Sequence, residues 1–353
     1  MLAGTMMAEH QLFEASTFVA PPPALDIAED PLVEQSHGLI APKRLMLVAG
    51  RSNPDLAERI ARRLQVTCST MTLKTFPSGE LYARYDESIR GADVFIVQPT
   101  STPVDPHLME LLVMIDAFRR SSASRITAVI PYYGYARQDR KDKPRVPISA
   151  KLVANLLSAA GTNRVLTMDL HKAQIQGFFD IPVDHLFAAP VIIEYCARLQ
   201  MENLTIVSPD AGGAERARAY AKRLDAELAV VDKRRTEDGT AEVMNVIGDV
   251  QGRTCILQDD IIDTAGTICK AAVGLKDAGA ERVLACAVHG VLSGPAIERI
   301  ERSPLDQLIV TNSVPLRGDG QNCRKIVVLT VARLLGQAIR NIHEETSVSS
   351  LFV

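Results

Sequence analysis

The chain has 353 residues, of which 47% are hydrophobic and 23% charged. That length predicts about two domains, and the composition argues against a disordered chain or a fibrous repeat. Lys plus Arg number 39 against 42 Asp plus Glu, giving a net charge of -3. This balance argues against a protein whose main task is to coat the phosphate backbone of nucleic acid.

The sequence predicts neither a membrane span nor a cysteine framework. The longest apolar stretches, such as Leu111–Met114 and Val327–Val331, fall far short of the roughly 20 residues that cross a bilayer. The six cysteines are scattered without a C-x-x-C pair, which favours reduced thiols over a zinc site or disulfides. We therefore expect a soluble, cytoplasmic protein with no nucleic-acid or membrane partner.

Residues 1–42 differ from the rest of the chain. They contain no Lys or Arg, several acidic residues and the triple proline Pro21–Pro23, which is the opposite of a signal or transit peptide. We expect a flexible N-terminal leader here.

From Lys43 onward, short apolar runs alternate with helical periods, which is typical of β-α units around a mostly parallel sheet. We expect an α/β fold with two similar domains, 43–188 and 189–353, and with the last helix packed back on the first domain. The predicted elements are, in chain order, a strand at Leu45–Ala49, a helix at Pro54–Leu64, a strand at Val94–Gln98, a helix at His107–Phe118, a strand at Ile126–Ile130, a helix at Pro147–Ala160, a strand at Val165–Met168, a helix at Pro190–Leu199, a strand at Leu204–Ser208, a helix at Ala214–Leu224, strands at Leu228–Val231 and Cys255–Gln258, a helix at Thr267–Ala278, a strand at Arg282–Val288 and a helix at Thr330–His343.

In such sheets the chemistry lies at the carboxyl ends of the strands. After the strand ending at Gln258 comes the segment Asp259–Thr267, in which small and hydroxylated residues precede a helix. Backbone N–H groups and the positive helix end there suit a phosphomonoester, while the carboxylates can accept hydrogen bonds from sugar hydroxyls or hold Mg²⁺. The segment predicts a ribose-phosphate site made of Asp259, Asp260, Asp263, Thr264, Ala265, Gly266 and Thr267.

Two other interpretations of the same segment are weaker. The D-D-x-x-D string also occurs in prenyl-diphosphate enzymes, but it lies on helices there and follows an apolar β-run here. A simple helix cap needs one acidic residue rather than three.

This segment resembles the phosphoribosyl-pyrophosphate fingerprint shared by type I phosphoribosyltransferases and ribose-phosphate pyrophosphokinases. The resemblance to the second family extends from about Lys43 to Val353 and implies two type I phosphoribosyltransferase-like domains. It also implies transfer of pyrophosphate from ATP to the 1-hydroxyl of ribose 5-phosphate with Mg²⁺, giving phosphoribosyl pyrophosphate and AMP, in a homo-oligomer of dimers that assemble to a hexamer. The further motifs that carry it, in the family's order, are Tyr135–Lys143, Thr167–His171, Gln174–Asp180, Ser208–Gly213 and Asp232–Arg235.

The resemblance implies a role for residues in each motif. Arg137 and Gln138 contact ATP, and His171 with Asp210 holds Mg²⁺ on the triphosphate. From residue types alone, Arg137 and Gln138 also fit a solvated charge run, His171 a structural histidine and Asp210 a helix cap.

Lys233 and Arg235 follow the strand ending at Val231 and precede a glycine-containing segment that predicts a mobile loop. Such a cation pair suits phosphoryl transfer, in which catalysis is mainly positioning and charge neutralisation. The resemblance implies that Lys233 is catalytic and that Arg235 binds ribose 5-phosphate. A cation-rich surface loop is the alternative.

The segment 76–80 matches the part of the family that reaches the ATP of an adjacent subunit, which implies ATP contacts from Ser78, Gly79 and Glu80. The chain departs from the family's common residues at Ser78, Asp105–His107, Lys172 and Ala265. If the backbone of Ala265 required a positive φ, its side chain would cost about 1 kcal/mol.

Three other functions compete with this interpretation. A phosphoribosyltransferase needs only one such domain and no nucleotide loop, and a Walker-type kinase lacks its G-x-x-x-x-G-K-[ST] string here. A non-catalytic regulatory homologue stays open because of Ser78, Lys172 and Ala265. Control by phosphate or ADP and the role of the leader cannot be predicted from the sequence.

Overall fold

A computed structural model describes residues 43–235 and 242–351, with the side chains of 233–244 left undescribed. The predicted leader at 1–42 lies outside the described residues. Within the described ranges, no helix combines the length and apolar character needed to cross a membrane. All six cysteines fall in this part of the chain and are free thiols.

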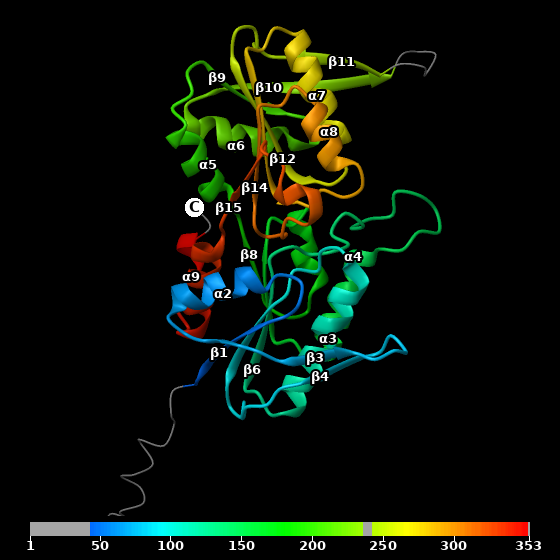
Figure 1. The fold of residues 1–353 in the computed structure, drawn as a ribbon, viewed down its shortest axis with the longest axis vertical. Coiled ribbons are helices and arrows are strands. Elements are labelled where there is room, and N and C mark those ends of the chain that lie inside the picture. Colours follow the sequence, from blue (N-terminus) through cyan, green and yellow to red (C-terminus); the bar gives the residue numbers. More distant parts are fainter. Residues whose placement is uncertain (1–42, 236–241, 352–353) are drawn as a thin grey trace, which may run out of the picture. The chain divides into compact units, whose positions relative to one another are not determined.

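The first lobe is built on a six-stranded sheet in the order β2-β1-β5-β6-β7-β8, in which every neighbouring pair is parallel. A separate antiparallel hairpin, β3–β4, stands beside it (Figure 1). Its elements are β1 (Leu45–Ala49), α2 (Pro54–Leu64), β2 (Cys68–Ser69), β3 (Thr72–Thr75), β4 (Leu81–Arg84), β5 (Asp93–Val97), α3 (Val104–Arg120), β6 (Arg125–Ile130), α4 (Ser149–Ala160), β7 (Arg164–Met168), the 3₁₀ turn η2 (Ala173–Phe178) and β8 (Val183–Leu186).

The second lobe has a seven-stranded sheet in the order β11-β10-β9-β12-β13-β14-β15. Only the β10–β11 pair in it is antiparallel. The elements are α5 (Ala189–Arg198), β9 (Leu204–Ser208), η3 (Ala211–Gly213), α6 (Ala214–Leu224), β10 (Glu227–Arg235), β11 (Glu242–Ile247), β12 (Thr254–Ile262), α7 (Gly266–Asp277), β13 (Arg282–Gly290), α8 (Ala296–Arg302), β14 (Gln307–Thr311), η4 (Gly318–Gln321), β15 (Ile326–Leu329), α9 (Ala332–His343) and η5 (Ser349–Leu351).

The predicted α/β class is confirmed, and every predicted strand and helix is present within a few residues of its expected bounds, apart from two strand ends. The prediction missed several short elements, which carry weak periodicity of their own. These are β2, the β3–β4 hairpin, β8, β11, β14, β15 and α8.

The first strand end that differs from the prediction is that of β12. The predicted end at Gln258 is wrong, because pairing with β13 continues as far as Ile262 opposite Gly290. Asp259 and Asp260 therefore lie within the strand, where successive side chains point to opposite faces.

The second strand end that differs from the prediction is that of β10. The predicted end at Val231 is wrong, because β11 pairs with β10 and places Lys233 opposite Met244 and Arg235 opposite Glu242. Both cations stand on strand backbone rather than in a loop. The glycine-containing segment that follows, 236–241, lies outside the described residues.

One hydrophobic core is shared by both sheets. It joins Leu47 and Leu166 of the first sheet to Ile206 and Ile256 of the second, all fully buried. Two further cores lie under α3 and α4 in the first lobe and under α7 and α8 in the second. The shared core places the carboxyl ends of strands from both lobes at one junction, where the candidate site lies.

The last helix, α9, packs on α2, the first helix of the described chain (Figure 1, red against blue). Asn53 caps α2 by accepting a hydrogen bond from the Leu56 amide at 3.2 Å. The helices approach closely at Gly336, where an added Cβ would lie 3.4 Å from Cβ of Arg63. The domain boundary near residue 188 stays a prediction.

Candidate active site

A cavity of about 240 Å³ lies at the junction of the lobes, beside the carboxyl ends of β7, β9 and β12. The structure thus brings together most of the residues that the sequence singled out. The predicted residues that line the cavity are Arg137, His171, Asp210, Asp259, Asp260, Asp263, Thr264, Ala265, Gly266 and Thr267.

The phosphate loop, residues 263–267, ends at the first turn of α7. Ala265 adopts φ +58°, so this position does require the left-handed conformation that the sequence analysis considered, at a cost of about 1 kcal/mol for a side chain. The resulting turn directs the loop and the N-terminus of α7 into the cavity, an arrangement that suits an anion.

Two contacts from α8 and the loop before it hold the phosphate loop, and the sequence analysis missed both. The Ser293 hydroxyl donates to Asp263, and Nη1 of Arg299 donates to the carbonyl oxygen of Thr264 at 2.9 Å. Arg299 thereby provides a hydrogen-bond donor for a backbone carbonyl oxygen within the turn. The only signal in the sequence was that these residues follow strand β13.

Asp260 is the most constrained carboxylate of the cavity. It is 5% exposed, and its two oxygens face two different cationic or potentially cationic groups. Oδ2 lies 2.8 Å from Nδ1 of His171, and Oδ1 lies 3.1 Å from Nη1 of Arg216 on α6. Burial opposes ionisation of Asp260, yet the hydrogen bond from His171 and the charge of Arg216 hold its pKa well below the usual range. No motif in the sequence marks Arg216.

Asp259 lies beside it and lines the same cavity. It is less buried than Asp260, and its Oδ1 accepts a hydrogen bond from the Asp260 amide at 2.8 Å. Burial, followed by the neighbouring Asp260 carboxylate, raises the pKa of Asp259. Of the adjacent pair, Asp259 is therefore the carboxyl group that holds a proton more readily.

Asp210 offers the oxygen donor that Mg²⁺ prefers, and His171, which lines the same cavity, offers an imidazole nitrogen, so a polyphosphate and water would supply the other ligands. Because Asp260 accepts from Nδ1 of His171, the ring's Nε2 is left for a metal. Asp210 is exposed, and one of its oxygens accepts from the Gly213 amide at 2.9 Å. The described residues contain no cluster of three or more His, Cys, Asp or Glu that could hold a metal alone, and Mg²⁺ commonly takes its remaining ligands from phosphates and water.

Arg137 links the two lobes across the cavity. Its Nη1 lies 2.9 Å from Oδ2 of Asp263, which joins the predicted nucleotide motif to the phosphate loop. Arg137 also lines a second cavity of about 620 Å³, whose walls include Tyr132 and Tyr135. Gln138 lines this second cavity as well, with its side-chain oxygen accepting from the Ser149 hydroxyl at 2.6 Å.

The remaining predicted residues are not gathered into the first cavity. Ser78, Gly79 and Glu80 form the exposed turn between β3 and β4, where the Ser78 hydroxyl donates to Glu80 at 2.9 Å. Lys233 and Arg235 stand on β10, and their side chains lie outside the described residues. Their predicted roles stay predictions.

A buried polar layer lies behind the His171 segment. His289 of β13, 1% exposed, meets the carbonyl oxygens of Met168 and Asp169 through Nε2, at 3.2 Å each. His185 accepts from the Leu170 amide at 2.8 Å. Burial lowers the pKa of both histidines to about 4 and raises the pKa of Asp169 to about 7.

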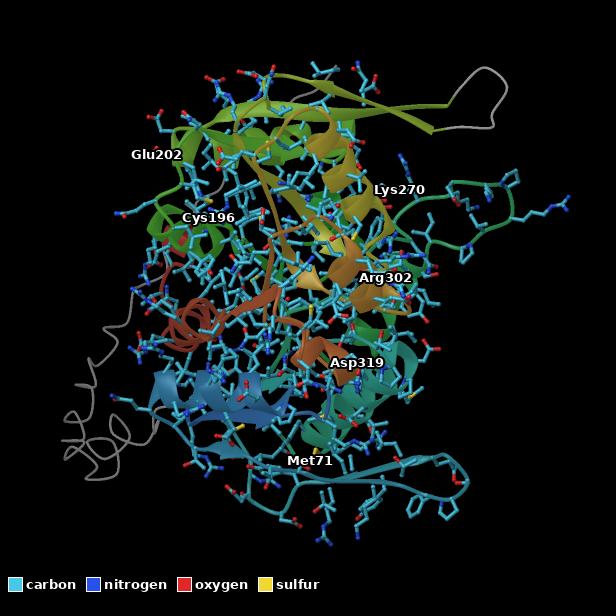
Figure 2. All side chains as sticks on the ribbon, turned by 45° about the horizontal axis from the view of Figure 1, so that its top comes forward. Met71, Cys196, Glu202, Lys270, Arg302 and Asp319 are labelled. Atoms are coloured by element: carbon cyan, nitrogen blue, oxygen red, sulfur yellow. The ribbon has the colours of Figure 1, made fainter. Side chains whose placement is uncertain are left out.

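A third cavity of about 830 Å³ lies on the outer side of the phosphate loop, between α7 and α8. Its lining includes Lys270 and Arg302, both labelled in Figure 2, together with Arg299 and the acidic Glu298. Arg302 pairs with Glu298 at 2.7 Å.

Comparisons with known proteins agree with one another. The model of the N-terminal domain of ribose phosphate pyrophosphokinase matches residues 45–161, and that of the phosphoribosyl synthetase-associated domain matches residues 237–353. The ribose-phosphate pyrophosphokinases of Neisseria meningitidis and Synechococcus elongatus are 55% and 56% identical to this chain, over 87% and 88% of it and 94% of each relative. The crystal structure of phosphoribosylpyrophosphate synthetase from Mycobacterium smegmatis matches with a TM-score of 0.81 and 44% identity, covering 86% of this chain and 100% of that one.

Proposed function

This chain belongs to the ribose-phosphate pyrophosphokinase family, and from that premise we propose that it transfers the β,γ-pyrophosphoryl group of ATP to the 1-hydroxyl of ribose 5-phosphate. The family and fold that the motifs predicted are confirmed. The products of the proposed reaction are phosphoribosyl pyrophosphate, a precursor for nucleotide and amino-acid biosynthesis, and AMP.

The observation that carries the proposal is the contact between Arg137 and Asp263. It places a cation of the nucleotide motif 2.9 Å from a carboxylate of the phosphate loop, across the junction of the lobes. A transfer between two substrates requires their reacting atoms to be held a few ångströms apart. Two cavities that share Arg137 as a wall support such an arrangement.

We assign one substrate to each side of the junction between the lobes. The phosphate loop and the N-terminus of α7 bind the 5-phosphate, and Asp259 and Asp263 accept hydrogen bonds from the sugar hydroxyls. Arg137 and Gln138 bind the nucleotide, and His171 with Asp210 would hold Mg²⁺ on the triphosphate. Bound Mg²⁺ neutralises phosphate charge. We assign Lys233 and Arg235 to the transferred group, where charge develops.

The chemical step is an in-line displacement. The 1-hydroxyl oxygen bonds to the β-phosphorus, the bond from that phosphorus to the oxygen bridging to the α-phosphorus breaks, AMP leaves with the bridging oxygen, and the hydroxyl proton is released. Arg137 is placed to keep the two substrates at this junction.

Incubation with ATP, Mg²⁺ and ribose 5-phosphate tests the proposal, with products identified by mass and ³¹P spectra. Phosphoribosyl pyrophosphate and AMP in equal amounts are expected. ADP with a singly phosphorylated product would refute the assigned bond cleavage. A protein that binds both substrates without turnover would instead be the non-catalytic homologue.

Assembly and location are parts of the same proposal. We propose a homo-oligomer, in which the β3–β4 hairpin, with Phe76 and Tyr82 exposed at ring centroids 6.0 Å apart, reaches a neighbouring subunit. Light scattering of the purified protein tests this, and a monomer at assay concentration would contradict it. Six free thiols support a reducing, cytoplasmic location.

A further inference from the structure

Burial distinguishes Asp260 from the other carboxylates of the cavity. Both of its oxygens are already engaged within the protein, by His171 at 2.8 Å and Arg216 at 3.1 Å, and the residue is 5% exposed. A sugar hydroxyl would have to displace one of these partners. Asp263 also has both oxygens engaged, by Ser293 and Arg137, but its side chain is 37% exposed, and Asp259 is less buried than Asp260.

The hydrogen bond to Asp260 also determines which nitrogen of His171 is free. A carboxylate accepts, so Nδ1 of His171 donates to Asp260 and Nε2 is the ring nitrogen left for another partner. Histidines that bind metals usually have their second nitrogen fixed by a carboxylate in this way, and removal of that partner typically weakens metal affinity 10- to 100-fold.

The fold contains the same arrangement once more, away from the cavities described above. Asp93 on β5 is fully buried, receives Nε of Arg125 at 2.8 Å and lies 2.8 Å from Nδ1 of His343 on α9. In that position the triad joins a helix to a sheet. It therefore provides a control in which the same chemistry has only a structural role.

We propose that Asp260 is a positioning residue for His171, held in place by Arg216, and that it is not a ligand of the sugar. The inference rests on the proposed function, because it takes His171 as a ligand of the metal–triphosphate. Asp260 fixes the ring orientation and tautomer so that Nε2 faces the cavity, and Arg216 holds the other oxygen of the buried carboxylate in place.

The experiment compares Asp260→Asn with Asp259→Asn, Asp93→Asn and the wild type, all as the full chain. Solid-state NMR on ¹⁵N-histidine-labelled protein without ligands reports the tautomer of His171, assigned from the signal missing in His171→Asn. Calorimetry measures the affinity for Mn²⁺ with α,β-methylene-ATP, which resists cleavage, and separately the affinity for ribose 5-phosphate.

We expect wild-type His171 to carry its hydrogen on Nδ1. The side-chain amide introduced by Asp260→Asn offers one oxygen to two donors. This substitution should therefore lower the population of that tautomer and weaken the Mn²⁺–nucleotide complex 10- to 100-fold, with ribose 5-phosphate affinity changed less than threefold. Asp259→Asn should show the reverse pattern. Asp93→Asn should lower the melting temperature and leave the tautomer and both affinities unchanged.

The proposal is overturned if His171 is not the Nδ1–H tautomer in the wild type, or if Asp260→Asn leaves it unchanged. It is also overturned if Asp260→Asn loses ribose 5-phosphate as strongly as Asp259→Asn does. A wild-type protein that binds no Mn²⁺–nucleotide refutes the proposed function instead, and the tautomer measured without ligands still decides whether Asp260 positions His171.

Discussion

Replacing His289 by glutamine should make the stability of this protein less sensitive to acid. Burial lowers the pKa of His289 from 6.5 to about 4 in the folded state, whereas the unfolded chain returns it to about 6.5. Because the folded pKa is the lower one, the unfolded state binds more protons between these values. The stability from this residue is therefore complete above pH 6.5 and is lost as the pH falls toward 4.

The size of the effect follows from those two pKa values. Integrating the proton-binding difference from pH 7 to pH 5 gives a loss of about 2 kcal/mol from His289. Glutamine does not titrate and keeps an amide donor for the carbonyl oxygens of Met168 and Asp169. Asp169 affects the pH dependence of stability in the opposite direction. Burial raises its pKa to about 7, so its contribution to the free energy of unfolding grows as the pH falls. It is present in both proteins, so the prediction concerns their difference.

Urea unfolding at pH 7 and pH 5 measures the effect. Between these pH values the free energy of unfolding of His289→Gln should fall by about 2 kcal/mol less than that of the wild type. His185→Gln should behave in the same way, because burial lowers the pKa of His185 to about 4 as well. Parallel pH dependence in wild type and both variants would refute the reasoning.

Two further predictions concern the roles assigned to the junction. Lys233→Ala should lower turnover by roughly 10²- to 10⁴-fold with a much smaller effect on ATP affinity. Abolished ATP binding in calorimetry, together with normal turnover at saturation, would contradict the catalytic role of Lys233. Asp263→Ala or Asp259→Ala should weaken ribose 5-phosphate by roughly 10- to 150-fold, the loss of one charge-assisted hydrogen bond, and affect ATP far less. His171→Ala should show the reverse, and equal losses for both ligands, measured in one assay, would indicate misfolding rather than separate sites.

Most residues of the candidate site could be predicted from the sequence, because the functional residues of this fold lie at the carboxyl ends of strands. His171, Asp210 and the phosphate loop each follow an apolar run that is easily recognised as a strand, and parallel strands bring their carboxyl ends to one edge. The left-handed backbone at Ala265 could also be considered, because a side chain there replaced a glycine expected in the loop.

The direction of individual side chains could not be predicted in the same way. Whether Asp260 points inward depends on where β12 ends, and that end is fixed by pairing with β13 rather than by residues of β12 itself. Arg216 and Ser293 come from elements that reach the site only through the tertiary fold. Their residue types occur widely on helices and loops, so no local pattern marks them.

The short strands were missed for a related reason. β14 and β15 are apolar runs of five and four residues, and periodicity alone does not distinguish so short an apolar run in a strand from one in a buried helix. Each strand of the β3–β4 hairpin has four residues, of which two are exposed and none is fully buried, so the hairpin offers only a short and weak apolar pattern.

The packing of α9 on α2 has a consequence for the order of events on the ribosome. Synthesis proceeds from the N-terminus, so β1, α2 and the rest of the first sheet leave the ribosome while their last partner is still untranslated. The contact between His343 and Asp93 joins residues 250 positions apart, and the Arg125 guanidinium donates to the Ile342 carbonyl at 2.9 Å. Until those final residues emerge, the apolar face of α2 and the buried carboxylate of Asp93 lack their covering helix. Until α9 has been synthesised, the nascent first lobe is thus an incomplete unit, and a chain truncated before α9 would leave that face exposed to chaperones and to other nascent chains.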